Sequence, residues 1–474
     1  MQTIILGGIT GLNVSFKSAG HFAIANILRR NGYSCQVINI AEIADVDTLL
    51  SMIDGYVKSD TLWIGISNSM LNTICGKHDI SEIAFRLMDR YQAISPNVRF
   101  LIAGNGNSFG NLSKGWYRFQ GFTEREIIEF TDDCVHGRDS SIVTFNKEFT
   151  DFHSTPVIYT DQDVMTWERY LPLEVSRGCI FRCAFCSFPL NGKKKFDYIK
   201  DEEALRTELV NNWENFGITN YSMTDDTFND SMFKLERLKS VLDSLPFKIR
   251  FVCYLRLDLL MRHRDMIPLL RDMGLVSCQV GIETMDLNNA KLIGKGVPFE
   301  DQISFIRELR TGPWADITIN SNFIVGFPYD TMEGVDRLID WQHSKENPLD
   351  DFGINALGII PLERKNSRWY SEFDQNYKDH GYYFPKEDSN WINLKSGLDF
   401  VTLNQKLRDY NATLRSITKF TGFYLMAKTN LGIPIEDMLI KTKSQIREEY
   451  DVDAREAALS DIYIKEIVRR SGTC

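Results

Sequence analysis

The chain has 474 residues, of which 43% are hydrophobic and 25% charged, and its formal net charge is −10. This length predicts two or three globular domains, and the negative charge makes nucleic acid an improbable partner, because phosphate binding requires clustered Lys and Arg. The N-terminus has no basic leader, and no apolar run approaches the roughly 20 residues that span a bilayer. We therefore expect a cytoplasmic protein with no membrane partner.

Residues 1–137 alternate short β-branched runs with amphipathic segments. A helical pattern after the first strand ends at Gly32, which is a common helix C-cap, and Thr123 with Glu126 has the spacing of a capping box. Repeated strand and helix units predict an α/β fold with a Rossmann-like, doubly wound parallel sheet that binds its ligand at the carboxyl ends of the strands. The predicted strands are residues 3–8, 34–40, 61–67, 98–104 and 118–121.

Residues 138–170 lose this periodicity, and we expect an irregular linker there with at most one short hairpin. Six further strand and helix units occupy residues 171–361, too few for a closed eight-stranded barrel, and predict a partial (β/α)6 TIM-type barrel with its chemistry at the C-terminal rim. Residues 362–474 predict a mainly helical C-terminal domain. The predicted barrel strands are residues 171–176, 219–225, 248–256, 277–283, 316–327 and 352–361.

Three of the nine cysteines, Cys179, Cys183 and Cys186, are clustered directly after the first strand of the barrel. The other cysteines are isolated, which is not the pattern of a disulfide framework. Three thiolates at this spacing can hold an iron–sulfur cluster and leave one iron open for catalysis, whereas electron-transfer clusters normally have four cysteine ligands. The alternative of a zinc site needs a fourth Cys or a nearby His, and no His is nearer than His153.

The pattern Cys-x-x-x-Cys-x-Phe-Cys, in which Phe185 precedes Cys186, resembles the signature of the radical S-adenosylmethionine (SAM) superfamily. The resemblance covers residues 171–361 through the segments EVSRGC, TDDTFND, YLRLD, VGIETMD and FIVGFPYDT. It implies a [4Fe-4S] cluster on the three cysteines, with SAM chelated to the open iron. It further implies reductive cleavage of SAM to methionine and a 5′-deoxyadenosyl radical, and an electron donor such as flavodoxin or ferredoxin.

Strand alternation and the resemblance together suggest how SAM is held. Gln279, Gly281 and Glu283 share one face of their strand, and Glu283 matches a family position that contacts SAM. Arg256 is placed to pair with the SAM carboxylate. For Glu283 and Arg256 the alternative is a structural salt bridge at the barrel rim.

Further SAM contacts are expected from the second and fifth strands of the barrel. Asp225 and Asp226 stand where the family grips the SAM amino group, although the local sequence differs from the usual one, and a structural salt bridge is again the alternative. Gly326 and Pro328 would shape the strand end near adenine. The predicted SAM-binding residues are thus Phe185, Asp225, Asp226, Arg256, Glu283, Gly326 and Pro328.

The N-terminal segment resembles the cobalamin-binding domain that precedes many radical SAM cores. Its runs IGISNSM and LIAGNGNS stand where that domain encloses the nucleotide tail of cobalamin. The matching residues are Ser67, Ser69, Gly104, Gly106 and Ser108. The Asp-x-His-x-x-Gly run that supplies a cobalt ligand does not follow the first strand, and His21 and His78 lack its context. Another nucleotide, or a scaffold without cofactor, are the alternatives.

If cobalamin binds, the resemblance implies methylation of an unactivated carbon of a small molecule or peptide. The alternatives are a cobalamin-independent rearrangement, cyclisation or epimerisation, and a cluster-bearing binding or sensing protein. Methylthiotransferases carry three N-terminal cysteines, but Cys35, Cys75 and Cys134 do not match their spacing. Tyr254 and Trp369 are placed to contact the substrate.

Overall fold

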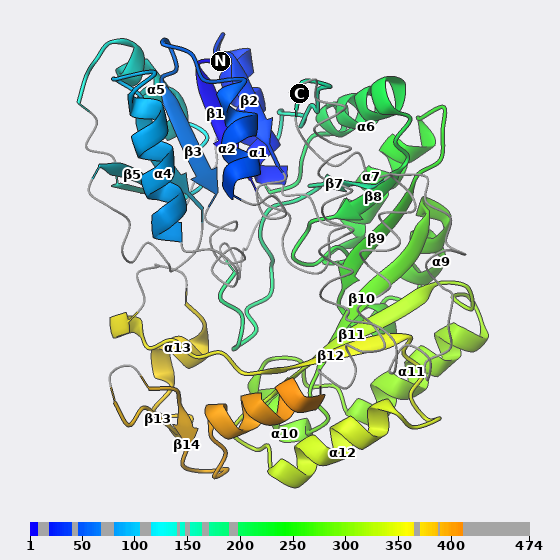
Figure 1. Ribbon diagram of the computed structural model, residues 1–474. Coiled ribbons are helices and arrows are strands. Elements are labelled where there is room, and N and C mark those ends of the chain that lie inside the picture. Colours follow the sequence, from blue (N-terminus) through cyan, green and yellow to red (C-terminus); the bar gives the residue numbers. More distant parts are fainter. Residues whose placement is uncertain are drawn as a thin grey trace, which may run out of the picture. The chain divides into compact units, whose positions relative to one another are not determined.

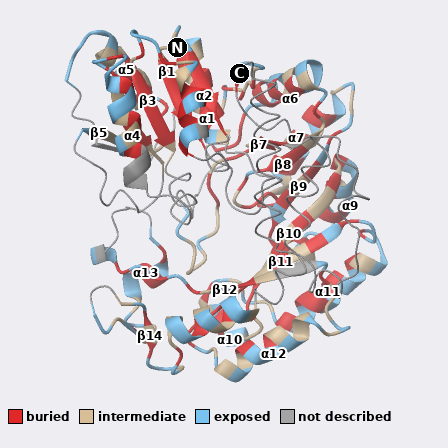
Figure 2. Ribbon diagram, viewed as in Figure 1, coloured by how far each residue is buried: buried red, intermediate tan, exposed pale blue. Residues whose placement is uncertain are grey.

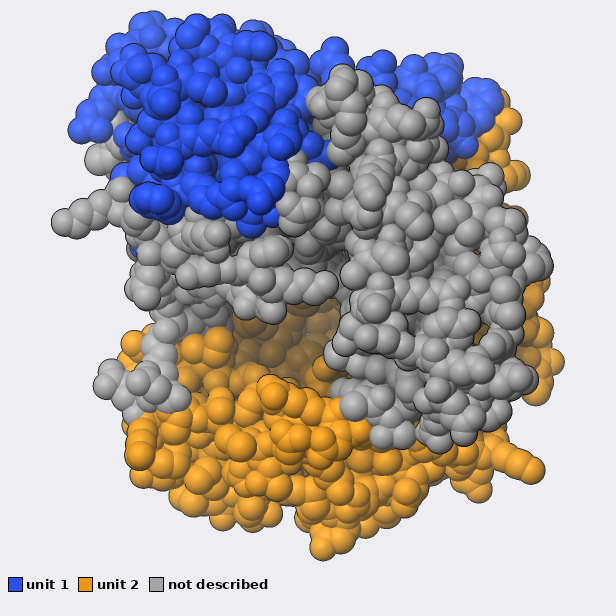
Figure 3. All heavy atoms as spheres, in the orientation of Figure 1, with its two compact units in different colours: residues 1–172, 207–218, 415–474 blue, residues 173–206, 219–414 orange. Residues whose placement is uncertain are grey.

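The computed structural model divides the chain into two compact units (Figure 3). The first comprises residues 1–172, 207–218 and 415–474, and the second comprises residues 173–206 and 219–414. The structure describes residues 1–7, 19–39, 46–67, 80–104, 115–139, 143–146, 152–163, 170–188, 198–364, 370–386 and 389–410. No helix in these ranges is long and apolar enough to cross a bilayer.

The first unit contains a six-stranded parallel sheet with the order β2-β1-β3-β4-β5-β6 (Figure 1). The order reverses between β1 and β3, so the carboxyl ends of these two strands form the switch point at which doubly wound sheets bind ligands. All five predicted strands are present. The strands are β1 (Thr3–Leu6), β2 (Cys35–Ile38), β3 (Trp63–Ser67), β4 (Arg99–Ala103), β5 (Trp116–Gly121) and β6 (Val143–Asn146).

The described helices of this unit are α1 (Ala19–Arg30), α2 (Val46–Asp54), α4 (Ile80–Gln92) and α5 (Glu126–Val135). The predicted end of α1 is confirmed, because Gly32 has φ 86° and the Tyr33 N–H donates to the Leu28 carbonyl at 3.0 Å. The predicted capping box of α5 is wrong. Its N-cap is Arg125 without a side-chain hydrogen bond, and the Thr123 carbonyl oxygen, rather than its hydroxyl, accepts the N–H of Ile127 at 3.0 Å.

Two described stretches of the predicted linker, residues 143–146 and 152–163, are part of the first unit. Strand β6 pairs in parallel with β5 and extends the sheet beyond residue 137. Residues 152–163 pack on α1, where the rings of Phe22 and Tyr159 have centroids 4.7 Å apart and Arg29 forms an ion pair with Asp163. This segment therefore belongs to the core of the first unit.

The predicted half-barrel has six strands in consecutive order, β12-β11-β10-β9-β8-β7, and lies mostly in the second unit. Its strands form the buried centre of the unit, with helices along the outer face (Figure 2). The strands are β7 (Tyr170–Leu173), β8 (Asn220–Met223), β9 (Arg250–Leu255), β10 (Leu275–Glu283), β11 (Thr318–Val325) and β12 (Asp351–Ala356). The helices are α6 (Glu202–Phe216), α7 (Met232–Asp243), α8 (Leu257–Arg262), α9 (Met266–Met273), α10 (Leu287–Leu292), α11 (Phe299–Thr311) and α12 (Met332–Gln342). The first three residues of β7 and residues 207–216 of α6 are grouped with the first unit.

The described part of the predicted C-terminal domain belongs to the same compact unit as the half-barrel. Trp391 is buried, and its indole N–H donates to the Leu357 carbonyl at 2.7 Å. Residues 411–474 lie outside the described residues. The elements are η1 (Leu362–Arg364), α13 (Glu372–Asn376), the antiparallel pair β13 (Tyr382–Tyr383) and β14 (Ile392–Asn393), and a helix over residues 400–410.

Candidate active site

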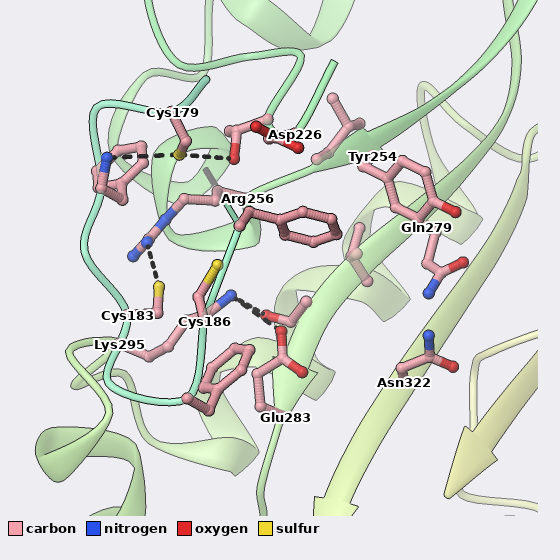
Figure 4. A pocket seen from close by; sticks show the side chains of 17 residues that line it. Cys179, Cys183, Cys186, Asp226, Tyr254, Arg256, Gln279, Glu283, Lys295 and Asn322 are labelled. Carbon is pink, nitrogen blue, oxygen red and sulfur yellow. Dashed lines mark hydrogen bonds and ion pairs between the residues drawn. The ribbon is translucent and has the colours of Figure 1, made fainter. Parts of the chain in front are cut away.

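The three clustered cysteines lie on the loop after β7 and line one side of a cavity of about 190 Å³ (Figure 4). Cys179 is buried, and Cys183 and Cys186 are half-buried. The opposite walls come from the ends of β8 and β9 and from β10 and β11. They are formed by Asp226, Thr227, Tyr254, Leu255, Arg256, Gln279, Val280, Gly281, Glu283 and Asn322, with Phe181, Phe185, Phe188 and Lys295 completing the lining.

The surroundings of Cys179 disfavour a free thiolate. Burial raises the pKa of the Cys179 thiol, while hydrogen bonds from the Thr227 hydroxyl and the Phe181 N–H oppose that rise. The Thr227 oxygen lies 3.3 Å and the Phe181 nitrogen 3.4 Å from the sulfur. A thiolate formed here needs a cation to replace its proton, and a metal supplies one.

Arg256 lies between Cys179 and Cys183 in Figure 4. Its guanidinium stacks over the Phe181 ring at 3.9 Å and pairs with both carboxylate oxygens of Asp258 at 2.9 Å. Its Nη1 is also 3.3 Å from the Cys183 sulfur. The charge of Arg256 is thus compensated by Asp258, and its free edge faces a cysteine of the cluster loop.

Gln279, Gly281 and Glu283 all line the cavity, in agreement with the predicted shared face. The register between β10 and β11 shifts between Gly281 and Glu283, and Glu283 has φ 70°. Lys295 donates to the Gly281 carbonyl at 3.0 Å and pairs with Glu283 at 3.3 Å. A Cβ at Gly281 would lie 2.5 Å from the Lys295 nitrogen, so the absence of a side chain there leaves room for this pair.

Lys295 was not predicted as a site residue. Its local signal is the sequence GKG, in which Gly294 and Gly296 have φ 80° and 70° and allow the chain to turn back toward the cavity.

The adjacent residues Asp225 and Asp226 point in different directions. Asp226 lines the cavity, and burial, followed by the charge of Asp225, raises its pKa to about 7. Asp225 is not among the lining residues. It is buried, accepts the N–H groups of Val175 and Ser176 at 3.0 and 3.1 Å, and pairs with Lys234. Asp225 therefore ties the end of β7 to the end of β8, as in the salt-bridge alternative.

Lys234 forms the centre of a buried ionic network beneath the cluster loop. Its side chain is fully buried and lies 3.1 Å from Asp225 and 3.0 Å from Asp230. Its ammonium also donates to the Thr227 carbonyl at 2.8 Å, and Thr227 in turn contacts Cys179. The network thereby fixes the segment that faces the cysteines. Sequence reasoning missed it, since a lysine on the apolar face of α7 has no distinctive motif.

Gly326 and Pro328 do not line the cavity. Gly326 has φ 99°, and a Cβ there would lie 2.7 Å from the Trp391 ring. Its N–H donates to Asp330 at 2.7 Å, which closes the turn after β11. Both observations give Gly326 a structural role in the fold.

Two of the predicted cobalamin-binding residues are described. Ser67 ends β3, and Gly104, with φ 135°, follows β4. His21 is buried on α1 with its Nδ1 3.0 Å from the Asn39 side-chain oxygen, and burial lowers its pKa to about 4. Ser69, Gly106, Ser108, Cys75, His78 and Trp369 lie outside the described residues.

Residues 173–341 match the model of the Radical SAM superfamily. The matched residues include the three clustered cysteines and most of the cavity walls, so this part of the chain is a radical SAM domain.

Known proteins resemble the chain in sequence or in fold. The ribosomal protein uS12 methylthiotransferase RimO of Thermodesulfovibrio yellowstonii is 25% identical over 344 residues, which cover 67% of this chain and 73% of the relative. The anaerobic magnesium-protoporphyrin IX monomethyl ester cyclase of Cereibacter sphaeroides is 26% identical, over 40% of this chain and 32% of the cyclase.

Among solved structures, the radical SAM methyltransferase TsrM of Kitasatospora setae, with cobalamin and a [4Fe-4S] cluster bound, has a TM-score of 0.58. It is 14% identical, with 83% of this chain and 82% of that chain covered. The cobalamin-dependent radical enzyme OxsB has a TM-score of 0.55 at 13% identity, with 99% and 80% covered. At these identities the likeness establishes the fold.

The donor set of the cavity fits a [4Fe-4S] cluster. The lining includes three thiols but, among the described residues, neither a fourth Cys nor a His. Nor do any three Cys, His, Asp or Glu side chains of the described ranges lie close enough to hold a single ion. A cluster is larger than one tetrahedral ion and accepts three cysteine ligands with one iron left for another ligand.

Proposed function

We propose that this enzyme is a cobalamin-dependent radical SAM methyltransferase that acts on an unactivated carbon. The observation that carries the proposal is the combination of a three-cysteine cavity in the second unit with a β2-β1-β3-β4 sheet in the first. Such a sheet offers a ligand crevice at its switch point, and Ser67 and Gly104 lie at that edge. The cavity would hold the cluster, and the crevice would hold the nucleotide tail of cobalamin.

In this proposal Cys179, Cys183 and Cys186 hold a [4Fe-4S] cluster. When bound and reduced, the cluster supplies the electron that cleaves SAM to a 5′-deoxyadenosyl radical, and cobalamin supplies the transferred methyl group. Arg256 would help to hold the cluster loop in place, because the Nη1 of its guanidinium lies 3.3 Å from the Cys183 sulfur. Phe181, stacked on that guanidinium, limits the access of water to it.

The chain's charged groups would orient SAM. Asp226 faces the cavity and would accept hydrogen bonds from the SAM amino group, which favours its ionised form. Lys295 would hold the SAM carboxylate, and Glu283 would fix the position of Lys295 and contact the ribose. Phe185 lines the same wall and would limit water near the reacting atoms. Asp225 and Gly326 would act indirectly, by supporting the walls of the cavity. Asp225 would do so through its side chain, which pairs with Lys234, and Gly326 through its backbone, which approaches Trp391 closely.

Pro328 lies in the turn that follows Gly326 and would act in the same indirect way. In the first unit, Ser67 and Gly104, with Ser69, Gly106 and Ser108, would enclose the nucleotide tail. His21 is already bonded to Asn39, so the proposal includes no cobalt ligand from this residue.

The similarity to RimO favours methylthiotransfer as a second candidate. That function requires N-terminal cysteines for a second cluster. Cys35 is buried within β2 and its pKa is raised to about 12 by burial, whereas Cys134 is half-buried on α5. The environment of Cys35 suits a core residue better than a ligand, so we rank this candidate second.

Anaerobic reconstitution distinguishes the candidates. The first predicts about four irons per chain, cleavage of SAM to 5′-deoxyadenosine, and bound cobalamin after addition of hydroxocobalamin. Cys183→Ala should abolish iron binding and cleavage, while the control Cys134→Ala should retain both. About eight irons, of which about half disappear in Cys134→Ala, would instead support methylthiotransfer. Iron and cleavage without cobalamin uptake would support a cobalamin-independent rearrangement, cyclisation or epimerisation.

A further inference from the structure

A row of neutral carboxamides lies on the inner face of the half-barrel. We call Gln279, Asn320, Asn322 and Asn355 the amide row. In the register of the parallel strands, Gln279 of β10 lies beside Asn320 of β11, and Asn355 of β12 lies beside Ile324 of β11. Ile324 and Asn322 are two residues apart and therefore share a face of β11. Along β11 the amide row alternates with buried residues, and Gln279 and Asn322 line the cavity.

The amide row has unused hydrogen-bonding capacity. Within the part of the chain that the structure describes, no hydrogen bond reaches any of its four side chains, and the Asn320 side-chain oxygen is shielded from solvent without a partner. Each carboxamide can donate two hydrogen bonds and accept two. The shielded Asn320 oxygen costs stability while it lacks a partner, and the half-buried Gln279 and Asn322 amides line the cavity with free hydrogen-bonding groups, so a ligand there could satisfy them.

Figure 4 shows the Gln279 and Asn322 carboxamides pointing toward one another on the side of the cavity away from the cysteines. Gly353 lies opposite Asn322 on β12, and a Cβ there would lie 2.8 Å from the Asn322 oxygen. It would also lie 3.8 Å from the Asn355 nitrogen. Because Gly353 has no side chain, the Asn322 and Asn355 carboxamides both have space above this part of β12.

We propose that the amide row binds the substrate, and that the substrate is an uncharged molecule presenting an amide or lactam group. The inference rests on the proposed function and specifies its substrate class. An amide offers a donor and an acceptor side by side, which two neighbouring carboxamides match. Tyr254 lies beside Gln279 in the register of the neighbouring strand β9 and is 43% exposed, so its ring adds an aromatic face next to the carboxamides.

The charges around the cavity support an uncharged substrate. Lys295 is assigned to the SAM carboxylate, and Arg256 is paired with Asp258, so neither cation remains for a substrate anion. Asp226 is assigned to SAM. A charged group placed on the amide row would lose its water without gaining a counterion, which disfavours its binding.

Binding of small probes to the anaerobically reconstituted protein tests the inference. The uncharged probes are 2-pyrrolidone, a lactam, and N-acetylglycine N-methylamide, an open-chain amide; the charged counterpart is the N-acetylglycinate anion. Saturation-transfer NMR titrations should detect at least one uncharged probe binding more tightly than N-acetylglycinate. The tighter of the two uncharged probes identifies a cyclic or a peptide-like source of the amide.

Variants connect probe binding to the amide row. Asn322→Leu and Gln279→Met keep the side-chain shape and remove hydrogen bonds, so each should weaken probe binding by about five-fold. Gly353→Ala should weaken it by displacing Asn322. The control Asn288→Leu changes an exposed residue of α10 and should bind the probe as wild type does. Iron content and circular dichroism verify the fold of each variant.

Equal or tighter binding of N-acetylglycinate would overturn the inference, and so would unchanged probe binding in both Asn322→Leu and Gln279→Met. The wild-type preparation is assayed in parallel for 5′-deoxyadenosine. Deoxyadenosine formation without amide binding would refute this inference alone. Amide binding that depends on the amide row, without deoxyadenosine formation, would refute the proposed function and leave the amide site standing.

Discussion

Replacement of Lys234 by Met should destabilise the second unit severely. The Lys234 side chain and its partners Asp225 and Asp230 have no exposed surface. Removal of one partner from a buried ion pair costs about 3–5 kcal/mol, because it leaves an uncompensated buried charge. One lysine here serves two carboxylates, so we expect the upper part of that range. Met matches the length of lysine, which limits any contribution from lost packing.

Urea unfolding of the cluster-free protein, followed by circular dichroism, measures this loss. Lys239→Met on the same helix is the matched control. Lys239 pairs with Asp243 and Asp272, but its partners are largely exposed, so its loss should cost no more than about 1 kcal/mol. Asp225→Asn added to Lys234→Met should recover part of the stability, since it removes a stranded charge. If Lys234→Met unfolds at the same urea concentration as Lys239→Met, the reasoning about the buried network is wrong.

Two further variants test local features. Gly326→Ala should destabilise the protein by about 2 kcal/mol or more, because its φ of 99° disfavours a side chain and its Cβ would meet the Trp391 ring; a urea midpoint equal to that of wild type would contradict this. The pKa of Asp226 is raised to about 7, so its protonated form stabilises the cluster-free fold below about pH 4, and this contribution is lost as the pH rises to about 7. Asp226→Asn removes this pH dependence. The free energy of unfolding of the variant, measured by urea titration relative to that of wild type, should therefore increase by about 2–3 kcal/mol between pH 5 and pH 8. If the difference between the two proteins is the same at both pH values, Asp226 has an ordinary pKa.

The sequence predicted the elements whose signals are local. The strands of both sheets are short apolar runs bounded by helices, and buried parallel strands have that pattern. Strand β6 was not predicted as a member of the sheet, because residues 138–170 lack the strand and helix periodicity of the segments around them, and its pairing with β5 depends on the fold. The spacing of Thr123 and Glu126 was misleading, since a backbone turn satisfied the start of α5 instead.

The site was predictable where a motif lies in one loop and less so where distant residues meet. The positions of Cys179, Cys183 and Cys186 around one cavity follow from their spacing. The partners of Lys295 depend on the irregular register of β10, which no sequence pattern specifies. Likewise, whether Asp225 or Asp226 faces the cavity depends on where β8 ends and on a lysine buried on α7.

Glu283 has a left-handed backbone conformation, with φ 70°, that lowers the stability of the fold. A residue other than glycine in the left-handed region is disfavoured by about 1–2 kcal/mol, and Glu283 is the residue of that kind within the described ranges. Glycine at this position would relax the chain but would delete the carboxylate that holds Lys295. The strained backbone at Glu283 is therefore retained together with the ion pair to Lys295 at the cavity wall, and replacement by glycine would exchange that pair for a relaxed chain.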